Sequence, residues 1–539
     1  MSELQRPIFN FHGGLDLPGH KAESTSAPVA DMPLATRFTL PLQQHIGEPD
    51  EPLVKVGERV LTGQVIARSA EYISAPIHAP CSGTVVEIGE YAIPHPSGLQ
   101  APCIVIDSDG RDEWAELPAP WPNYEEMNPA ELRERIRWAG IVGLGGAGFP
   151  TSVKVNPGPD HPIHTLILNA AECEPYISCD DMLMREQPDK VLAGLAIIRH
   201  VVGARECLIG IEANKPEAIA ALQLALEHSG CPDTHILVVP ARYPSGGEKQ
   251  LIQLLTGREV PSHGLPAEIG VLCQNVATAA AVADAVLAGR PLIERIVTVT
   301  GQGVAEPGNF RVRLGSPMNQ LIEQAGGYTA AAHRLILGGP MMGFALHTDA
   351  LPITKAANCL LLASQAEAPE PPPAQPCIRC GRCAEVCPAL LLPQQLYWHA
   401  RARDLDKAQD YHLFDCIECG CCAYVCPSHI PLVQYYRYAK TAIWSQERDK
   451  AKSDIARRRH EARLARIERL EAERKAKLRK KKEALEAKPK GRGTDPKKAA
   501  IEAAMQRVAA KKAAQAESVN TQTDVAGQTG NADPQSPEA

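Results

Sequence analysis

The chain has 539 residues, of which 44% are hydrophobic, and a formal net charge of −7 at pH 7. This length exceeds what one hydrophobic core supports, so roughly three to five domains of ordinary globular composition are expected. No stretch approaches the about 18–20 uninterrupted apolar residues of a spanning helix, and the N-terminus has no apolar signal core. We therefore expect neither export nor insertion, and attachment to a membrane would need a partner or the tail.

Residues 1–130 show a β pattern. Apolar and polar residues alternate around glycine turns over residues 54–66, and residues 77–86 repeat the pattern. The two stretches resemble the halves of a biotinyl/lipoyl-carrier barrel sandwich. Carriers of that family hold their cofactor on a hairpin lysine, and residues 68–76 contain none. We therefore predict a structural sandwich without covalent biotin or lipoyl.

Residues 131–290 alternate helical and strand patterns. Helices are expected over residues 129–139 and 218–226, and short buried strands over residues 166–168 and 207–211. This alternation is typical of an α/β domain.

A glycine-rich stretch, GLGGAGFPT, occupies residues 143–151. Glycines allow close approach of the backbone to a phosphate and aim successive N–H groups at it, and Lys154 adds a positive charge just beyond. One alternative is a turn without a ligand. Another is a Rossmann fingerprint, because three of the glycines have its spacing. The loop follows only two strand-like residues and is closed by a proline, which is a poor context for that fingerprint.

Residues 291–345 return to a β pattern. Residues 346–376 are expected to be a connector that ends in a stiff, proline-rich linker. A small domain over residues 377–440 follows, and it contains one cysteine pattern twice.

Each cysteine run has the spacing C-x2-C-x2-C-x3-C-P, which is typical of bacterial ferredoxins with two [4Fe–4S] clusters. In that motif the fourth cysteine of each run binds the other run's cluster. The sequence thus predicts one cluster on Cys377, Cys380, Cys383 and Cys426, and another on Cys416, Cys419, Cys422 and Cys387. Structural zinc favours two separated pairs of thiolates, and a disulfide framework needs an oxidising compartment, so both fit less well. Cys421 breaks the register and is not expected to be a ligand.

Residues 446–539 form a charged tail. Residues 455–488 are expected to be helical, with Glu471–Lys475 and Glu473–Lys477 as supporting i,i+4 pairs. A solvated single helix is the simplest interpretation, and attraction to anionic lipid or nucleic acid is the alternative. From Asp495 onward the polar, low-complexity sequence predicts disorder.

Four stretches resemble, in the same order, the NADH-oxidising flavoprotein subunit of respiratory complex I. They are residues 143–154, which resemble its flavin loop, and residues 169–175, 243–249 and 274–278. With the two cysteine runs and the sandwich, residues 10–440 resemble the RnfC (RsxC) family of the Rnf (Rsx) ion-translocating electron transport complex. Residues 296–345 look like the soluble-ligand-binding β-grasp (SLBB) domain of that family. The implied fold is a multidomain α/β and α+β protein with a ferredoxin-like domain.

The resemblance also implies sites for FMN and NADH in the 131–290 domain. For FMN it implies Gly143, Gly145, Gly146 and Lys154 around the phosphate and ribityl chain, Asn169 and Glu172 beside the ring, and Gly247, Asn275 and Thr278 completing the cradle. For the nicotinamide nucleotide it implies Phe149, Glu174 and Glu248. A turn capped by Asn169 and Glu172 is the alternative without a ligand. Ala171 and Lys249 replace acidic residues of complex I, so the choice between NADH and NADPH stays open.

The expected function is electron transfer between NADH, FMN and two [4Fe–4S] clusters, with no catalytic acid, base or nucleophile. A hydride carries two electrons and a cluster accepts one, so a flavin must stand between them. The resemblance implies a peripheral translocase subunit on the cytoplasmic face of the inner membrane. Its partners would be integral-membrane and iron–sulfur subunits, with ferredoxin or flavodoxin as further electron partners. A soluble flavin iron–sulfur NADH dehydrogenase acting alone is the alternative. A scaffold or nucleic-acid-binding protein leaves both cluster motifs unexplained, and no nucleic acid is expected.

Overall fold

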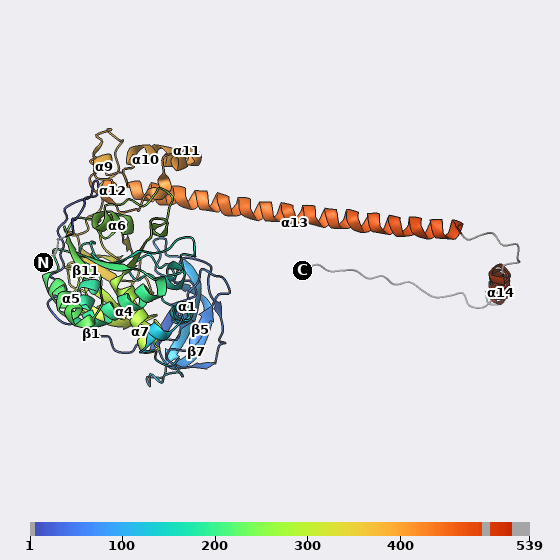
Figure 1. The fold of residues 1–539 in the computed structure, drawn as a ribbon, viewed down its shortest axis with the longest axis horizontal. Helices are drawn as coiled ribbons and strands as arrows, with labels where there is room; N and C mark the ends of the chain where they lie inside the picture. Colours follow the sequence, from blue (N-terminus) through green and yellow to red (C-terminus); the bar gives the residue numbers. More distant parts are fainter. Residues whose placement is uncertain (1–5, 488–495, 520–539) are drawn as a thin grey trace, which may run out of the picture. The chain divides into compact units, whose positions relative to one another are not determined.

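A computed structural model describes residues 6–487 and 496–519 (Figure 1). The contacts divide the chain into two units, Met1–Gln446 and Glu447–Ala539. The first contains four packed regions that follow one another in the sequence, except that β1 (Ala30–Asp31) joins the sheet of the third region.

The N-terminal region is a barrel sandwich of two small antiparallel sheets. One sheet has the order β2-β8-β7-β4 and the other β3-β5-β6. The strands are β2 (Arg37–Pro41), β3 (Glu51–Pro52), β4 (Arg59–Val60), β5 (Val65–Arg68), β6 (Ile77–His78), β7 (Gly83–Ala92) and β8 (Gln100–Ser108). Phe38, Leu40, Ile104 and Ile106 lie fully buried between them. The predicted sandwich is therefore confirmed.

The second region is a parallel four-stranded sheet with the order β11-β10-β9-β12. Its strands are β9 (Thr165–Ala170), β10 (Glu206–Glu212), β11 (Thr234–Val239) and β12 (Val271–Asn275). The helices are η1 (Tyr124–Glu126), α1 (Pro129–Trp138), α2 (Thr151–Lys154), α3 (Cys179–Glu186), α4 (Pro188–Val202), α5 (Pro216–Ser229), α6 (Glu248–Thr256), η2 (Pro266–Ile269) and α7 (Val276–Leu287). Helices α4 and α7 pack closely because Gly194 has no Cβ. A Cβ at this position would clash with the Ala279 backbone. The chain runs from β9 outward to β11 and then crosses back to β12, so the strand order reverses between β9 and β12.

The third region is a six-stranded sheet with the order β1-β14-β13-β17-β15-β16. Its elements are β1 (Ala30–Asp31), β13 (Glu294–Thr300), β14 (Gly308–Arg313), α8 (Met318–Gln324), β15 (Ala332–Leu337), β16 (Phe344–Ala345) and β17 (Cys359–Ser364). Strand β17 is buried along its length and pairs with both β13 and β15. The sheet thus takes a central strand from residues 346–376, the segment expected to be a connector.

The cysteine-rich region repeats its backbone conformation. Its helices are α9 (Arg382–Glu385), α10 (Pro393–Ala402), α11 (Leu405–Asp410), η3 (Leu413–Asp415), α12 (Cys421–Tyr424) and the start of α13 (Leu432–Glu486). Gly381 and Gly420 precede α9 and α12 with φ of 83° and 81°. Arg379 and Glu418 also match, with φ of 58° and 57°. The two cysteine motifs therefore have the same local backbone conformation.

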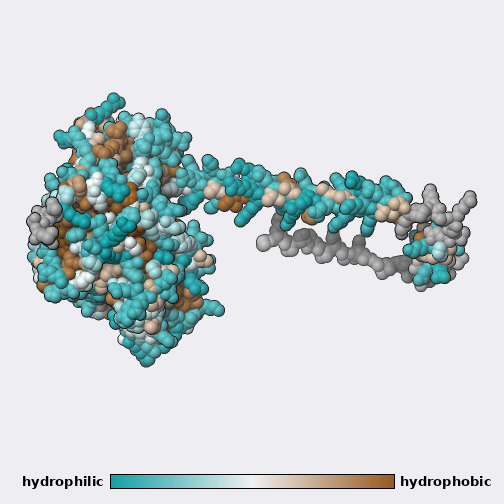
Figure 2. All heavy atoms as spheres, viewed as in Figure 1, coloured by the Kyte–Doolittle hydropathy of each residue, from teal (hydrophilic) through white to brown (hydrophobic). Residues whose placement is uncertain are grey.

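The second unit consists of the rest of α13 and of α14 (Pro496–Val519). The predicted helix over 455–488 lies in α13 as far as Glu486, and residue 488 falls outside the described residues. The surface of α13 beyond residue 446 is mainly hydrophilic (Figure 2). Disorder was expected from Asp495, yet residues 496–519 are helical, because their many alanines favour a helix. Among the described helices, none is long and apolar enough to cross a membrane.

Candidate flavin site and cysteine sites

The carboxyl ends of β9 and β12 form the edge at which the predicted flavin residues gather. Asn169 and Asn275 are direct partners in the pairing of these two strands. Open parallel sheets bind ligands outside the carboxyl ends of their strands where the strand order reverses. In this sheet the strand order reverses between β9 and β12, so their carboxyl ends form the edge where a ligand is expected.

The glycine loop lies beside this edge as a closed turn. The N–H of Gly143 donates to the Phe149 carbonyl over 2.8 Å, and the N–H of Leu144 donates to the Thr278 hydroxyl over 2.9 Å. A Cβ on Gly145 would lie 3.3 Å from the Asn275 amide nitrogen. Gly146 has a φ of 109° and is exposed, with nothing within 4 Å of the place of a Cβ. The loop therefore presents free backbone at the N-terminus of α7, close to Asn275 and Thr278.

Lys154, which lies just beyond the glycine loop, forms an ion pair with Glu248. The Lys154 ammonium lies 2.9 Å from a Glu248 carboxylate oxygen, and both side chains are partly exposed. Gly247 directly precedes Glu248 as the N-cap residue of α6. The ion pair between Lys154 and Glu248 therefore connects the first flavin stretch to the third at the start of α6.

Asn169 and Glu172 are engaged within the protein. The Asn169 side chain donates to the Gly246 carbonyl over 2.8 Å and accepts from the Ala171 N–H over 3.2 Å. The Glu172 carboxylate accepts from the N–H groups of Asp180 and Asp181 at the start of α3, over 2.7 and 3.3 Å. These are the contacts of a capped turn. Burial raises the pKa of Glu172 to about 7.

Glu174 and Phe149 differ in accessibility. The Glu174 carboxylate accepts from the N–H groups of Met341 and Met342, over 2.7 and 3.0 Å, between β15 and β16. Burial raises the pKa of Glu174. Glu174 therefore attaches the six-stranded sheet to the flavin domain, whereas Phe149 is half-buried in the glycine loop.

Four charged residues support the site without belonging to any sequence motif. The Asp180 carboxylate accepts from the Asn275 amide over 2.6 Å, and the Lys215 ammonium donates to the Ala171 carbonyl over 2.5 Å. The Lys21 ammonium lies 3.8 Å from the Glu172 carboxylate, and the buried Arg295 donates to the Leu144 carbonyl over 3.1 Å. No periodicity or spacing marks them in the sequence, because each contact joins separate segments.

The donor set of this edge fits a phosphorylated flavin. Two buried side-chain atoms, the Thr151 hydroxyl oxygen and the Gln274 amide nitrogen, have no hydrogen-bond partner among the described residues. Thr151 follows the glycine loop and Gln274 precedes Asn275. Unpaired polar groups, exposed glycine backbone and a lysine beside it are what an anionic, polar ligand needs.

The eight motif cysteines separate into two cavities. One is lined by Cys377, Cys380, Cys383 and Cys426, and the other by Cys416, Cys419, Cys422 and Cys387. Each cavity therefore takes three cysteines from one run and the fourth from the other. Cys421 is buried beside Cys419 and lines neither of these cavities.

The sulfur spacing argues against single metal ions in these cavities. A tetrahedral zinc ion with Zn–S bonds of about 2.3 Å holds its sulfurs about 3.8 Å apart. Among the described residues, no group of three potential ligand atoms within 4.8 Å of one another includes any of the eight cysteines. Sulfurs further apart suit a larger cluster.

The second cavity packs against the flavin domain. The Tyr243 hydroxyl donates to the Cys419 carbonyl over 2.7 Å. Tyr243, Cys419 and Cys421 form one buried cluster, which Cys173 of the second flavin stretch also contacts. A Cβ on Gly246 would lie 2.9 Å from the Cys173 sulfur. The flavin edge and the second cavity are therefore joined by packed side chains.

Comparison with known proteins agrees with these features. Family models match the RnfC barrel sandwich hybrid domain at residues 9–111, the Nuo51 FMN-binding domain at 136–284, the SLBB domain at 296–345 and a 4Fe-4S dicluster domain at 376–430. The C subunit of the ion-translocating oxidoreductase complex of Serratia proteamaculans is 47% identical over 506 residues, which are 94% of this chain and 70% of that protein. The chain belongs to the RnfC family.

Other members of the RnfC family differ from this chain in length. The corresponding protein of Pseudomonas aeruginosa is 53% identical over 466 residues, which are 86% of this chain. The chain spans 60% of that relative's length. A crystal structure of NAD+-reducing [NiFe]-hydrogenase has 20% identity, a TM-score of 0.42 and coverage of 58% of this chain and 62% of its own. The RnfC assignment therefore rests on the family members and the four domains.

Proposed function

We propose that this chain carries electrons from NADH through FMN to two [4Fe–4S] clusters and on to partner subunits of an ion-translocating oxidoreductase complex. The contact between Tyr243 and Cys419 supports this proposal most directly, because it joins the third flavin stretch to a residue that lines the second cysteine cavity. FMN, when bound, supplies the exchange between a two-electron hydride and single electrons.

The protein's own groups have distinct tasks in this proposal. The exposed backbone of Gly145 and Gly146 and the Lys154 ammonium bind the flavin phosphate, and Asn275 fixes the loop against α7. Phe149 and Glu248 lie at the accessible side of the loop and receive the dinucleotide. Asn169, Glu172 and Glu174 hold the surrounding backbone through their hydrogen bonds.

The setting of the chain is proposed from its relatives. They are named as C subunits of ion-translocating oxidoreductase complexes. We assign the chain to the cytoplasmic face of the inner membrane, with integral-membrane and iron–sulfur subunits as partners and with ferredoxin or flavodoxin as further electron partners.

Anaerobic purification with chemical analysis tests this function. We expect about eight iron and eight sulfide per chain, the content of two [4Fe–4S] clusters, together with one flavin. We also expect NADH-dependent reduction of an artificial dye. Iron without NADH-dependent reduction would contradict the proposed electron donor. Co-purification with hydrophobic subunits separates membership of a complex from a dehydrogenase that acts alone.

A further inference from the structure

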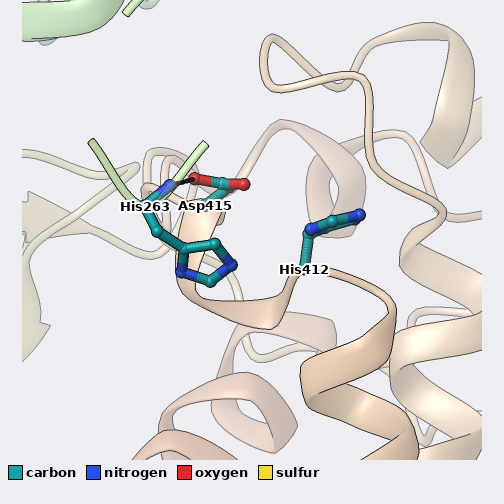
Figure 3. Close-up of side chains that lie close together, drawn as sticks. All are labelled: His263, His412 and Asp415. Carbon is teal, nitrogen blue, oxygen red and sulfur yellow. Dashed lines mark hydrogen bonds between the residues drawn. The ribbon is translucent and has the colours of Figure 1, made fainter. Parts of the chain in front are cut away.

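Three side chains outside both cysteine cavities converge where the flavin domain meets the cysteine-rich domain. His263 lies between α6 and η2, and His412 and Asp415 lie at the two ends of η3, directly before Cys416. One potential ligand atom of each lies within 4.8 Å of those of the other two. Figure 3 shows the three side chains and the hydrogen bond from the His263 N–H to Asp415.

The two histidines lie on turns that leave both rings accessible, and His412 ends α11 in the left-handed conformation. His263 and His412 have φ angles of 56° and 58°, in a region that residues other than glycine seldom adopt. Both are exposed, and neither ring makes a hydrogen bond to another described residue. The ring centroids lie 6.1 Å apart. The two turns therefore present two accessible imidazoles beside one carboxylate.

Hydrogen bonds hold the Asp415 carboxylate in its position beside the two imidazoles. Its carboxylate accepts from the Ser262 hydroxyl and from the His263 N–H. The Lys249 ammonium, 3.4 Å from one of its oxygens, is the competing cation. Within the described part of the chain, the other contact of the Lys249 ammonium is a 3.4 Å hydrogen bond to the Pro261 carbonyl, so this side chain can turn towards solvent. The oxygen that accepts from Ser262 has a second lone pair for a metal ion, and the other oxygen gains one when Lys249 turns away.

We propose that His263, His412 and Asp415 bind a divalent transition-metal ion of the zinc type, which ties the loop after α6 to the segment that enters Cys416. Two imidazoles and one carboxylate with a water molecule make a four-coordinate zinc site. The softer thiolates are committed to their own cavities, and none of the three residues lines either one. The bound ion links the loop of the flavin domain to the backbone of a cluster ligand.

The test uses the full-length protein with its iron content complete, equilibrated anaerobically with zinc and then gel-filtered. The variants are His263→Asn and His412→Asn, because asparagine tolerates the left-handed backbone and lacks the imidazole. The control is His333→Asn, an exposed histidine on β15. We expect the wild type and the control to retain one zinc more than each variant, with equal iron in all four. Equal zinc in all four, or none retained by the wild type, would overturn the site.

Hydrogen exchange tests the link between the domains. Zinc should slow amide exchange at residues 257–265 in the wild type and in His333→Asn, and should leave His412→Asn unchanged. Zinc retention that depends on the histidines without slower exchange would overturn the link between the two segments. This site is independent of the electron donor, so a failure here leaves the NADH experiment unaffected.

Discussion

The hydroxyl of Tyr243 donates a 2.7 Å hydrogen bond to the carbonyl oxygen of Cys419. Tyr243 belongs to the third flavin stretch, and Cys419 lines the cavity assigned to the second cluster. The Tyr243 side chain is buried, so its contacts fix the spacing between the two sites. The flavin edge and the second cavity therefore belong to one packed structure.

Replacing Tyr243 by Phe should slow electron passage from flavin to clusters without slowing flavin reduction. The change leaves the buried Cys419 carbonyl without its partner, at a cost of about 1–3 kcal/mol. Stopped-flow absorbance would follow the flavin and the clusters separately after mixing with NADH. Tyr328→Phe removes an exposed hydrogen bond to Asp349 and serves as the control. Unchanged cluster reduction in Tyr243→Phe would contradict this role.

Replacing Lys154 by Ala should weaken flavin retention by about tenfold, the effect of losing one charge-assisted hydrogen bond. Flavin content after gel filtration measures this effect. Lys190→Ala removes a comparable ion pair with Asp284 elsewhere in the same domain and should retain flavin. Gly146→Val should lower flavin content further, because a branched side chain is strained at a φ of 109° and fills the space above the loop. Wild-type flavin content in Lys154→Ala would exclude the phosphate contact.

Glu172 should make stability depend on pH. Burial raises its pKa to about 7, above the value of about 4.3 in an unfolded chain. The folded protein thus binds the Glu172 proton more tightly, so the contribution of Glu172 to stability is most favourable below about pH 4 and is lost as the pH rises through about 7. Glu172→Gln removes this loss, so at pH 8 the variant should be more stable than the wild type, by about 4 kcal/mol at most.

The measurement for Glu172 is the thermal unfolding midpoint at pH 5 and pH 8. The difference between Glu172→Gln and the wild type should grow with pH. Glu217→Gln, which changes an exposed carboxylate, should show no such trend. A constant difference at both pH values would show that Glu172 is ionised throughout.

Truncation after Ser445 should leave both clusters and NADH-dependent dye reduction intact. Buried residues of α13 end at Ile443. Truncation after Pro431 should instead destabilise the second cluster, because it removes Lys440, whose ammonium donates to the Cys416 carbonyl over 2.7 Å. Cluster loss on truncation after Ser445 would show that the tail packs on the cysteine-rich domain.

The crossed cysteine sets predict which substitutions act together. Cys387→Ala should remove the cluster held by Cys416, Cys419 and Cys422, so adding Cys416→Ala should lower the iron content little further. Combining Cys387→Ala with Cys377→Ala should remove both clusters. Iron counts and spectra of the reduced proteins distinguish these variants. Loss of the same cluster from the single Cys377 and Cys387 variants would show local ligation.

The sequence was most informative where the chemistry is local. The cysteine spacing and the glycine loop each lie within a short segment, and the flavin stretches 169–175 and 274–278 meet because the parallel strands β9 and β12 end at one edge. Strand β17 was missed because CLLLAS is a short apolar run that shows neither strand nor helix periodicity. Lys21 and Arg295 reach the site across more than a hundred residues, so no local pattern reveals them. The resemblance implies a nucleotide contact for Glu174, and no local pattern reveals that its carboxylate also accepts hydrogen bonds from the turn between β15 and β16.

We propose that electrons pass from NADH through the flavin edge into both cysteine cavities. Electron paramagnetic resonance of the anaerobic protein, frozen after mixing with NADH, tests it most directly. We expect signals of reduced [4Fe–4S] clusters in the wild type and one cluster fewer in Cys387→Ala. A wild-type sample in which NADH bleaches the flavin while both clusters stay oxidised would contradict it.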